Sequence, residues 1–325
     1  EVFTSKGYGY ANIEEAIPVD PDKTVFRIAS VSKIFTIASV LQLASKGYIE
    51  FEKDVNTYLK NFKLNNVHGY PVRVSHLLTH TDGFETRDLN TFSHHPNELI
   101  PLEQLLSKEL SQPVQKPGTM VTYGGYGTAL AGFLVQQVSG TVFEEYVEKE
   151  VFRPLKMYSS TFFQSLPSSL TDRMATTYYY EDKEDIFKPV QFLYVNTPPT
   201  GGASTTVKDM GNFIKAVLNK GRLEDSQVFS EDIVKMMNDQ QFTPHEKLPG
   251  VTFGFMEDIY NNQRGLVRDG SGLGIRSQIY LLPDHNMGYF YVQNTRGDQL
   301  IDEFNRAFLD RYFPFRESTN ESLYN

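Results

Sequence analysis

The chain has 325 residues, of which 40% are hydrophobic and 22% charged, and this is the length and composition of one large globular domain. A formal net charge of -9 argues against nucleic acid or an anionic membrane surface as a partner. The absence of cysteine excludes disulfides, thiolate catalysis and cysteine-ligated metals, and no run of about eighteen apolar residues is long enough to span a membrane.

The N-terminal part predicts two short strands followed by a long helix. The strands are expected at residues 2–10 and 14–19, around a turn at Ala11-Asn12. Apolar residues at helical spacing then follow Ser30-Val31-Ser32-Lys33, and Gly47 is a suitable stop for this helix.

The middle of the chain is mainly helical by its periodicity, and strand patterns follow it. Residues 178–200 are aromatic and irregular. Further helices are expected at 54–64, 74–79, 98–110, 128–138, 141–151, 207–219, 232–239 and 298–312, and strands at 251–255, 266–269, 278–282 and 287–293.

This order of elements predicts an α+β fold with an antiparallel sheet flanked by helices. We expect one catalytic domain whose sheet is assembled from both ends of the chain, about 1–55 and 200–312. A mainly helical insertion, about 56–199, would pack beside the sheet, and residues 313–325 would form a loose tail. A cleft between two such parts is a usual place for a small-molecule site.

Ser30 and Lys33 are candidates for nucleophilic catalysis. Residues three apart on a helix lie on the same face, one turn from each other. A serine hydroxyl becomes a good nucleophile when a base takes its proton, and a desolvated lysine can be that base. The spacing is common by chance, so its meaning depends on partners elsewhere in the chain.

Two further segments offer such partners. Tyr123 lies in a glycine-rich segment just before a predicted helix, where its phenol can be held rigidly and relay a proton; a purely structural loop tyrosine is the alternative. Arg268-Asp269-Gly270-Ser271-Gly272 ends a strand pattern, and it can place a cation and an open backbone beside a ligand. An ordinary glycine-rich turn is the alternative there.

In order and spacing, these three features resemble the class C β-lactamase and penicillin-binding-protein family of serine hydrolases. The resemblance covers about residues 7–308. It also rests on Phe26-Arg27-Ile28-Ala29, Leu77-Leu78-Thr79-His80-Thr81-Asp82-Gly83, Pro117-Gly118, Gly125-Tyr126, Ala131-Gly132, Val138-Ser139-Gly140, Phe152-Arg153-Pro154-Leu155-Lys156-Met157, Gly201-Gly202-Ala203-Ser204-Thr205, Asp209-Met210 and the strand from Gly274 to Pro283.

The resemblance implies a β-lactamase/transpeptidase-like fold and a role for each motif. Ser30 would be the nucleophile, Lys33 and Tyr123 would transfer its proton, and the backbone N–H groups of Ser30 and Ser271 would form the oxyanion hole. Substrate contacts would come from the residues that match the second and third motifs, namely Gly125, Arg268, Asp269 and Gly270.

The chain departs from the family pattern in three places, and the first two departures bear on substrate. The usual Tyr-x-Asn reads Tyr123-Gly124-Gly125, and the usual Lys-Thr-Gly or His-x-Gly reads Arg268-Asp269-Gly270. Arginine cannot serve as a neutral proton shuttle, but it can favour a tyrosinate or bind a carboxylate or phosphate with two hydrogen bonds. The strand that family members usually carry before Glu1 is missing. β-Lactam hydrolysis is therefore expected to be weak.

The family then implies an acyl-serine hydrolase for an amide or ester, such as a D-Ala peptidase or a D-alanyl esterase of cell-wall material. A short-chain carboxylesterase, a prodrug-maturing peptidase and a non-catalytic penicillin-binding sensor are the alternatives. The aromatic side chains would either favour apolar acyl groups or belong to the core, and they are Tyr178, Tyr179, Tyr180, Phe192 and Tyr194.

No metal or cofactor is expected. His76 and His80 have i, i+4 spacing and His94-His95 lies nearby, but no glutamate completes an HExxH arrangement. The repeat Gly270-x-Gly272-x-Gly274 has a strand–turn–strand setting, whereas a phosphate-binding loop precedes a helix.

The expected partner is a small-molecule or cell-wall-derived substrate, with no nucleic acid. The resemblance implies an extracytoplasmic location, at the bacterial cell surface, in the periplasm or secreted. Because the chain begins at Glu1 without a methionine, we expect a trimmed segment with any signal or membrane anchor outside it.

Overall fold

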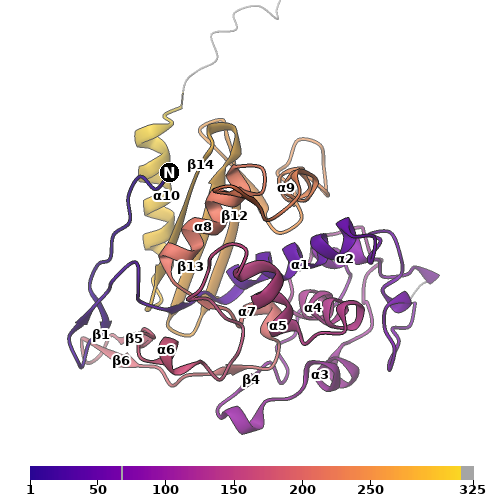
Figure 1. Cartoon of the computed structure of the whole chain (residues 1–325), viewed down its shortest axis with the longest axis horizontal. Helices are drawn as coiled ribbons and strands as arrows, with labels where there is room; N and C mark the ends of the chain where they lie inside the picture. The colour runs from indigo at the N-terminus through magenta and orange to yellow at the C-terminus, as the bar shows by residue number, and fades with distance from the viewer. Residues whose placement is uncertain (67–68, 316–325) are drawn as a thin grey trace, which may run out of the picture.

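A four-stranded antiparallel sheet, built from one continuous C-terminal stretch, forms one side of the molecule (Figure 1). The computed structural model describes residues 1–66 and 69–315, so most of the predicted tail at 313–325 lies outside the described residues. In spatial order the strands are β11 (Met256–Tyr260), β12 (Gln263–Gly272), β13 (Ile275–Leu282) and β14 (Met287–Gln293).

The two faces of this sheet pack against different helices, because successive side chains of a strand point to opposite faces. Ile279 and Leu281 face the main core, which also holds α8 (Val207–Leu218). Tyr280 and Leu282 belong to a separate cluster with Leu309 of α10 (Asp298–Tyr312). The sheet is therefore covered on both faces.

A mainly helical part lies beside the sheet, coloured purple to magenta in Figure 1. Its elements are η2 (Val55–Thr57), α2 (Val74–Leu78), η4 (Pro96–Glu98), α3 (Leu102–Glu109), α4 (Tyr126–Ser139), α5 (Phe143–Val147), η5 (Glu148–Phe152), α6 (Ser168–Thr171) and α7 (Pro198–Gly201). Helix α9 (Glu231–Asn238) packs against α1.

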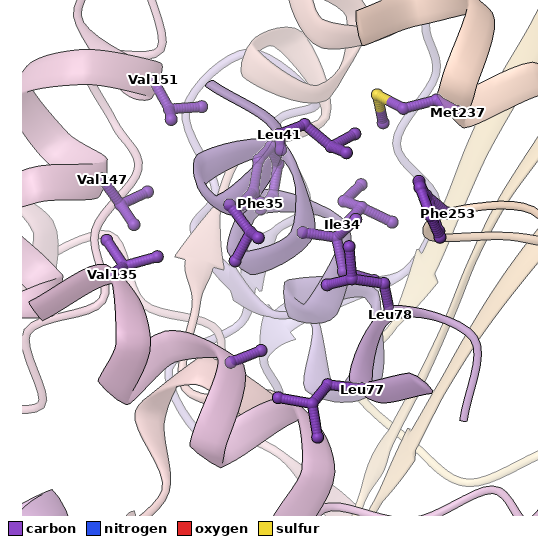
Figure 2. Packing of buried hydrophobic residues seen from close by; sticks show 14 of the residues in the cluster. Ile34, Phe35, Leu41, Leu77, Leu78, Val135, Val147, Val151, Met237 and Phe253 are labelled. Carbon is purple, nitrogen blue, oxygen red and sulfur yellow. The ribbon is translucent and has the colours of Figure 1, made fainter. Parts of the chain in front are cut away.

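Helix α1 (Lys33–Ser45) is the centre of the core. Every residue from Lys33 to Leu43 is buried, so the helix is enclosed on all sides. Its polar side chains in this span, Lys33, Thr36, Ser39 and Gln42, all donate hydrogen bonds to backbone carbonyls. Figure 2 shows the side chains that surround it, which come from both parts of the molecule and include Leu77, Leu78, Val135, Val147, Val151, Met237 and Phe253.

The N-terminal strands do not join the main sheet, contrary to the prediction. β1 (Tyr10–Asn12) and β2 (Ile17–Pro18) pair only with each other. β3 (Phe26–Arg27) pairs with β8 (Ser204–Thr205), and this pairing fixes the chain just before Ser30. Other short pairs are β4 (Phe92–Ser93) with β7 (Tyr194–Val195), β5 (Tyr178–Glu181) with β6 (Ile186–Pro189), and β9 (Arg222–Leu223) with β10 (Ser226–Gln227).

Three local predictions also differ from the structure. Residues 54–64 form only the short turn η2, because the side chain of Asn56 exchanges two hydrogen bonds with the backbone of Leu64 and replaces helical bonds. Residues 251–255 form a buried loop before β11, and the aromatic segment contains the hairpin β5–β6.

Candidate active site

Ser30 lies where the chain turns from β3 into α1. The short 3-10 helix η1 (Ala29–Ser32) leads directly into α1. Ala29 has a φ of 44°, which is a left-handed conformation that costs a non-glycine residue of order 1–2 kcal/mol. The turn is held by the hydrogen bond that Ala203 N donates to the buried Ser32 Oγ over 3.0 Å. Ser30 is thus presented at the start of the most buried helix.

Lys33 is buried against Ser30. Its Nζ donates to Ser30 Oγ over 2.9 Å and to the backbone carbonyl of Thr200 over 2.8 Å. Burial lowers the pKa of Lys33, and the cation of Arg268 lowers it further, while Tyr123 acts in the opposite direction. The ammonium is therefore destabilised beside the hydroxyl that needs a base.

Tyr123 completes the group from the loop before α4. The side chain is 41% exposed at the cavity, the Lys33 Nζ lies 5.1 Å from the centre of its ring, and its phenol interacts with Ser30 and Lys33. Burial alone would raise the pKa of this phenol, but the charges of Lys33 and Arg268 and the interactions with Ser30 and Lys33 outweigh it and lower the pKa to about 8. Ser30, Lys33 and Tyr123 thus form one coupled proton-transfer group.

Arg268 and His80 form a layer behind Tyr123. The guanidinium of Arg268 lies 5.8 Å from the centre of the Tyr123 ring, and the imidazole of His80 lies 4.7 Å from it, centre to centre. Arg268 Nε donates to Gly254 O over 2.6 Å, and its other end meets His80 Nε2 at 3.3 Å. Burial, with the cations Arg268 and Lys33, lowers the pKa of His80 well below its usual value, so the imidazole is neutral and can accept from Arg268.

A cavity of about 650 Å³ opens over this group. Among the predicted site residues, Ser30, Lys33, Tyr123, Gly125 and Ser271 line it. The rest of the wall is mostly apolar or hydroxyl-bearing, and its other residues are Arg27, Ala29, Thr86, Asp88, Thr91, Phe92, Gly124, Tyr126, Met174, Ala175, Thr176, Thr177, Val190, Gln191, Phe192, Leu193, Val195, Thr197, Thr200, Gly201, Gly272, Leu273 and Ile275.

The three residues of the third motif lie outside this wall. Arg268 is 3% exposed and sits beneath Tyr123, so it does not face the cavity. Asp269 lies on the opposite face of the strand, where it pairs with Arg276 and accepts from Gln278, because side chains alternate along β12. Gly270 packs against the turn that carries Ser30: a Cβ there would lie 2.3 Å from Ile28 O.

The aromatic segment divides between the cavity and other places. Phe192 lines the cavity. Tyr178 is fully buried in the core, and Tyr179 and Tyr180 are exposed. This segment therefore does not provide an extended aromatic wall to the cavity.

Several residues of the site carry no clear signal in the sequence. Thr200 contributes a carbonyl, whose position cannot be inferred from a side-chain pattern. His80 lies in a family-like segment, but its place beside Arg268 depends on two elements 188 residues apart in the sequence. The positive φ of His80, 55°, is equally invisible in the sequence.

The histidine pair at i, i+4 does not converge on one point. His76 Nδ1 accepts from the backbone N–H of Arg73 and caps α2, whereas His80 faces Arg268 and Tyr123. Within residues 1–66 and 69–315, no group of three or more potential ligands from His, Cys, Asp and Glu is placed to hold a metal ion. In the same part of the chain, no helix is both long and apolar enough to cross a membrane.

Comparisons with known proteins identify the family of the chain. The sequence model of the family described as "Beta-lactamase" matches residues 1–310. The protein flp of Staphylococcus aureus (strain MRSA252) is 27% identical over 221 residues, which is 67% of this chain and 43% of that protein. The chain thus spans less than half the length of this curated relative.

Two solved structures share the fold. The octameric penicillin-binding protein homologue from Pyrococcus abyssi superposes with a TM-score of 0.78 and 25% identity, covering 98% of this chain and 72% of that one. The penicillin-binding protein from Bacillus halodurans gives a TM-score of 0.75 and 23% identity, covering 92% of this chain and 90% of that one. With the family match over almost its whole length, the chain belongs to the Beta-lactamase family and has its β-lactamase/transpeptidase-like fold.

Proposed function

We propose that this protein is an acyl-serine hydrolase in which Ser30 attacks the carbonyl carbon of an ester or amide. The observation that carries the proposal is the buried Lys33 Nζ, which donates to Ser30 Oγ over 2.9 Å and lies 5.1 Å from the centre of the Tyr123 ring. Membership of the Beta-lactamase family supports the same chemistry.

The first step forms the bond between Ser30 Oγ and the acyl carbon. The Lys33–Tyr123 pair, once it has lost one proton, accepts the proton of Ser30. The pair then returns that proton to the leaving group as the bond between carbonyl carbon and leaving group breaks. Water releases the acyl group by the same transfers in reverse.

The negative charge on the carbonyl oxygen needs donors in the transition state. We assign them to the backbone N–H groups of Ser30 and Ser271, which both border the cavity. A donor of this kind contributes about 3 kcal/mol to catalysis.

For the substrate we propose an ester or amide of a D-amino acid from cell-wall material. The likeness to penicillin-binding protein homologues supports this class, and the largely apolar and hydroxyl-lined cavity of about 650 Å³ suits a compact acyl group. Cleavage of β-lactams should be weak, because the second motif has no amide side chain and Asp269 lies away from the cavity.

The test compares the wild type with Ser30→Ala on p-nitrophenyl acetate, D-alanine p-nitroanilide and nitrocefin. The wild type should turn over one of the first two, and Ser30→Ala should lose at least about a thousandfold in kcat/KM. Ser39→Ala is the matched control, since Ser39 is a buried serine of α1 that does not line the cavity and whose hydroxyl donates to Phe35 O. Full turnover by Ser30→Ala would refute the proposal, and a single stoichiometric burst without turnover would identify a sensor instead.

A further inference from the structure

Arg27 is a second cation at the cavity, and the mechanism does not use it. It lies on β3, three residues before Ser30, and its side chain lines the same cavity. Its Nη1 donates to Leu193 O over 2.5 Å, and its guanidinium lies 4.7 Å from the centre of the Phe192 ring. These contacts fix the plane of the guanidinium against one wall.

This cation has no anionic partner within the protein. None of the ion pairs formed by the described residues includes Arg27. Burial lowers the pKa of Arg27 to about 10, and no neighbouring charge adds to or offsets that effect. A guanidinium has five N–H donors, and the half-buried Arg27 donates to one protein acceptor, Leu193 O.

The other charged residues of the described cavity wall do not supply a partner. Lys33 is a cation that is committed to Ser30 and the carbonyl of Thr200. Asp88 is the single carboxylate of that wall, and its charge acts on Lys33. The cavity therefore holds one half-buried guanidinium, fixed by Leu193 O and the Phe192 ring, whose remaining donors are available to a ligand.

We propose that Arg27 is a substrate-binding residue that recognises a carboxylate on the substrate. The planar guanidinium presents paired N–H donors that match the two oxygens of a carboxylate. The formal net charge of -9 repels anions in general. The local positive charge of Arg27 is therefore the feature that attracts an acidic substrate to the cavity. This inference rests on the proposed hydrolase function and names its substrate class: esters or amides that carry a free carboxylate.

The first experiment uses the unmodified protein and matched pairs of substrates. In one pair the carboxylate is on the acyl group, as in mono-p-nitrophenyl adipate and its methyl ester. In the other pair it is on the leaving group, as in 3-carboxyphenyl butyrate and its methyl ester. We expect kcat/KM to favour the acid roughly tenfold or more in one of the two pairs, after the spontaneous rate is subtracted. Equal rates in both pairs would overturn the inference.

The second experiment changes the cation. Arg27→Met should bring the ratio of kcat/KM for the acid to kcat/KM for its methyl ester close to one, mainly by raising the KM of the acid. Arg27→Lys, which retains a charge without the planar fork, should recover part of the preference. Arg222→Met is the matched control, because Arg222 is an exposed arginine on β9 away from the cavity. An Arg27→Met variant that retains the wild-type preference would refute the role.

A binding measurement separates this inference from the proposed function. Ser30→Ala is mixed with the benzylamide of adipic acid or with its methyl ester, and binding is followed by thermal shift. We expect the acid alone to raise Tm, and this rise to disappear in Ser30→Ala/Arg27→Met. This readout needs no turnover, so it stands even if the protein is a sensor, and equal shifts by the acid and its ester would refute the carboxylate site.

Discussion

Arg268 stands at a position where the family usually has lysine or histidine, and its surroundings explain what an arginine does there. A guanidinium stays protonated at any working pH, so it acts on Tyr123 and Lys33 through its charge and not by proton transfer. It is held by Gly254 O on one side and by the neutral imidazole of His80 on the other. The pair therefore serves as a fixed positive charge behind the phenol.

Removing this charge should move the pH dependence of catalysis. Arg268 lowers the pKa of both Tyr123 and Lys33, so Arg268→Met should raise both values. In the wild type the phenol of Tyr123 loses its proton with a pKa of about 8. Because the reaction needs the deprotonated pair, kcat/KM should rise with pH up to about 8 and then level off. In Arg268→Met the rise should move roughly one to two pH units higher.

Arg268→Lys provides the control for that shift. It keeps a charge at the position, so its pH profile should stay closer to that of the wild type, although its maximal rate can fall because the contacts to Gly254 O and His80 change. A pH profile of Arg268→Met that coincides with the wild type would show that the arginine has only a structural role.

At the scale of elements, the site depends on how closely β12 approaches η1. Ser277 Oγ donates to Ile28 O over 2.7 Å, and Gly270 lies directly beside this bond. A Cβ at residue 270 would lie 2.3 Å from both Ile28 O and Ser277 Oγ and 3.2 Å from Ser30 N. The glycine is needed for the approach of two backbones, and not for the approach of a ligand.

Gly270→Ala should therefore displace the strand from Ser30. We expect a loss of about 2 kcal/mol in the free energy of unfolding and at least a tenfold loss of kcat/KM, because Ser271 would move with the strand. Urea unfolding and steady-state kinetics measure the two effects. Gly211→Ala on α8 is the control, since no atom lies within 4 Å of its added methyl group, and this variant should be unaffected or more stable. Wild-type values for Gly270→Ala would contradict this account of the glycine.

The same elements show how far the sequence predicts the structure. The bounds of α10 and β14 are predicted correctly and those of α8 to within one residue, because each shows a clear periodicity. Residues 54–64 are predicted as helix, and there side chain–backbone bonds of Asn56 override the pattern. The N-terminal strands are predicted in the main sheet, but strand pairing is a tertiary property that their short patterns do not specify.

The residues of the candidate site likewise divide into those that the sequence predicts and those whose place only the folded chain shows. Ser30, Lys33 and Tyr123 are found through motif spacing, and the structure brings them together. The orientation of Arg268 and Asp269 to opposite faces follows from strand alternation, which a motif comparison alone does not use. Arg27 and His80 acquire their places only through contacts with Leu193 and Arg268, so their surroundings require the folded chain.

At the scale of the whole molecule, one continuous core joins the sheet and the helical part. Leu266 and Ile279 of the sheet belong to the same buried cluster as Leu77 and Val135 of the helical part, with α1 between them. The cavity takes Ser271 from the sheet and Tyr123 from the helical part. Stability and site geometry are consequently coupled, and a buried charge in either part affects the free energy of unfolding of the whole chain.

Asp82 is a buried ionisable group of this kind. It is 4% exposed, its Oδ1 accepts from the backbone N–H of Phe84 over 2.9 Å, and its Oδ2 packs against Gly127 at the start of α4. It takes part in none of the ion pairs of the described residues. Burial raises its pKa from 3.8 to about 7, and the backbone hydrogen bonds only partly offset this effect.

This raised pKa fixes the sign of a pH effect on stability. The folded protein retains a proton on Asp82 that the unfolded chain releases above pH 3.8, so the contribution of this proton to stability is complete below 3.8 and is lost as pH rises to about 7. The loss is of order 4 kcal/mol between those limits. Asp82→Asn, which is neutral at every pH, should not show it.

Urea unfolding of the wild type and Asp82→Asn at several pH values tests this prediction. The difference in unfolding free energy should change in favour of the variant as pH rises from about 4 to 7, and should stay constant above that range, because other carboxylates titrate equally in both proteins. The same measurement on Glu85→Gln, at an exposed acid three residues away, controls for the general effect of removing a carboxylate. A constant difference between wild type and Asp82→Asn across the range would mean that the folded protein keeps Asp82 ionised, stabilised by a partner other than the backbone N–H of Phe84.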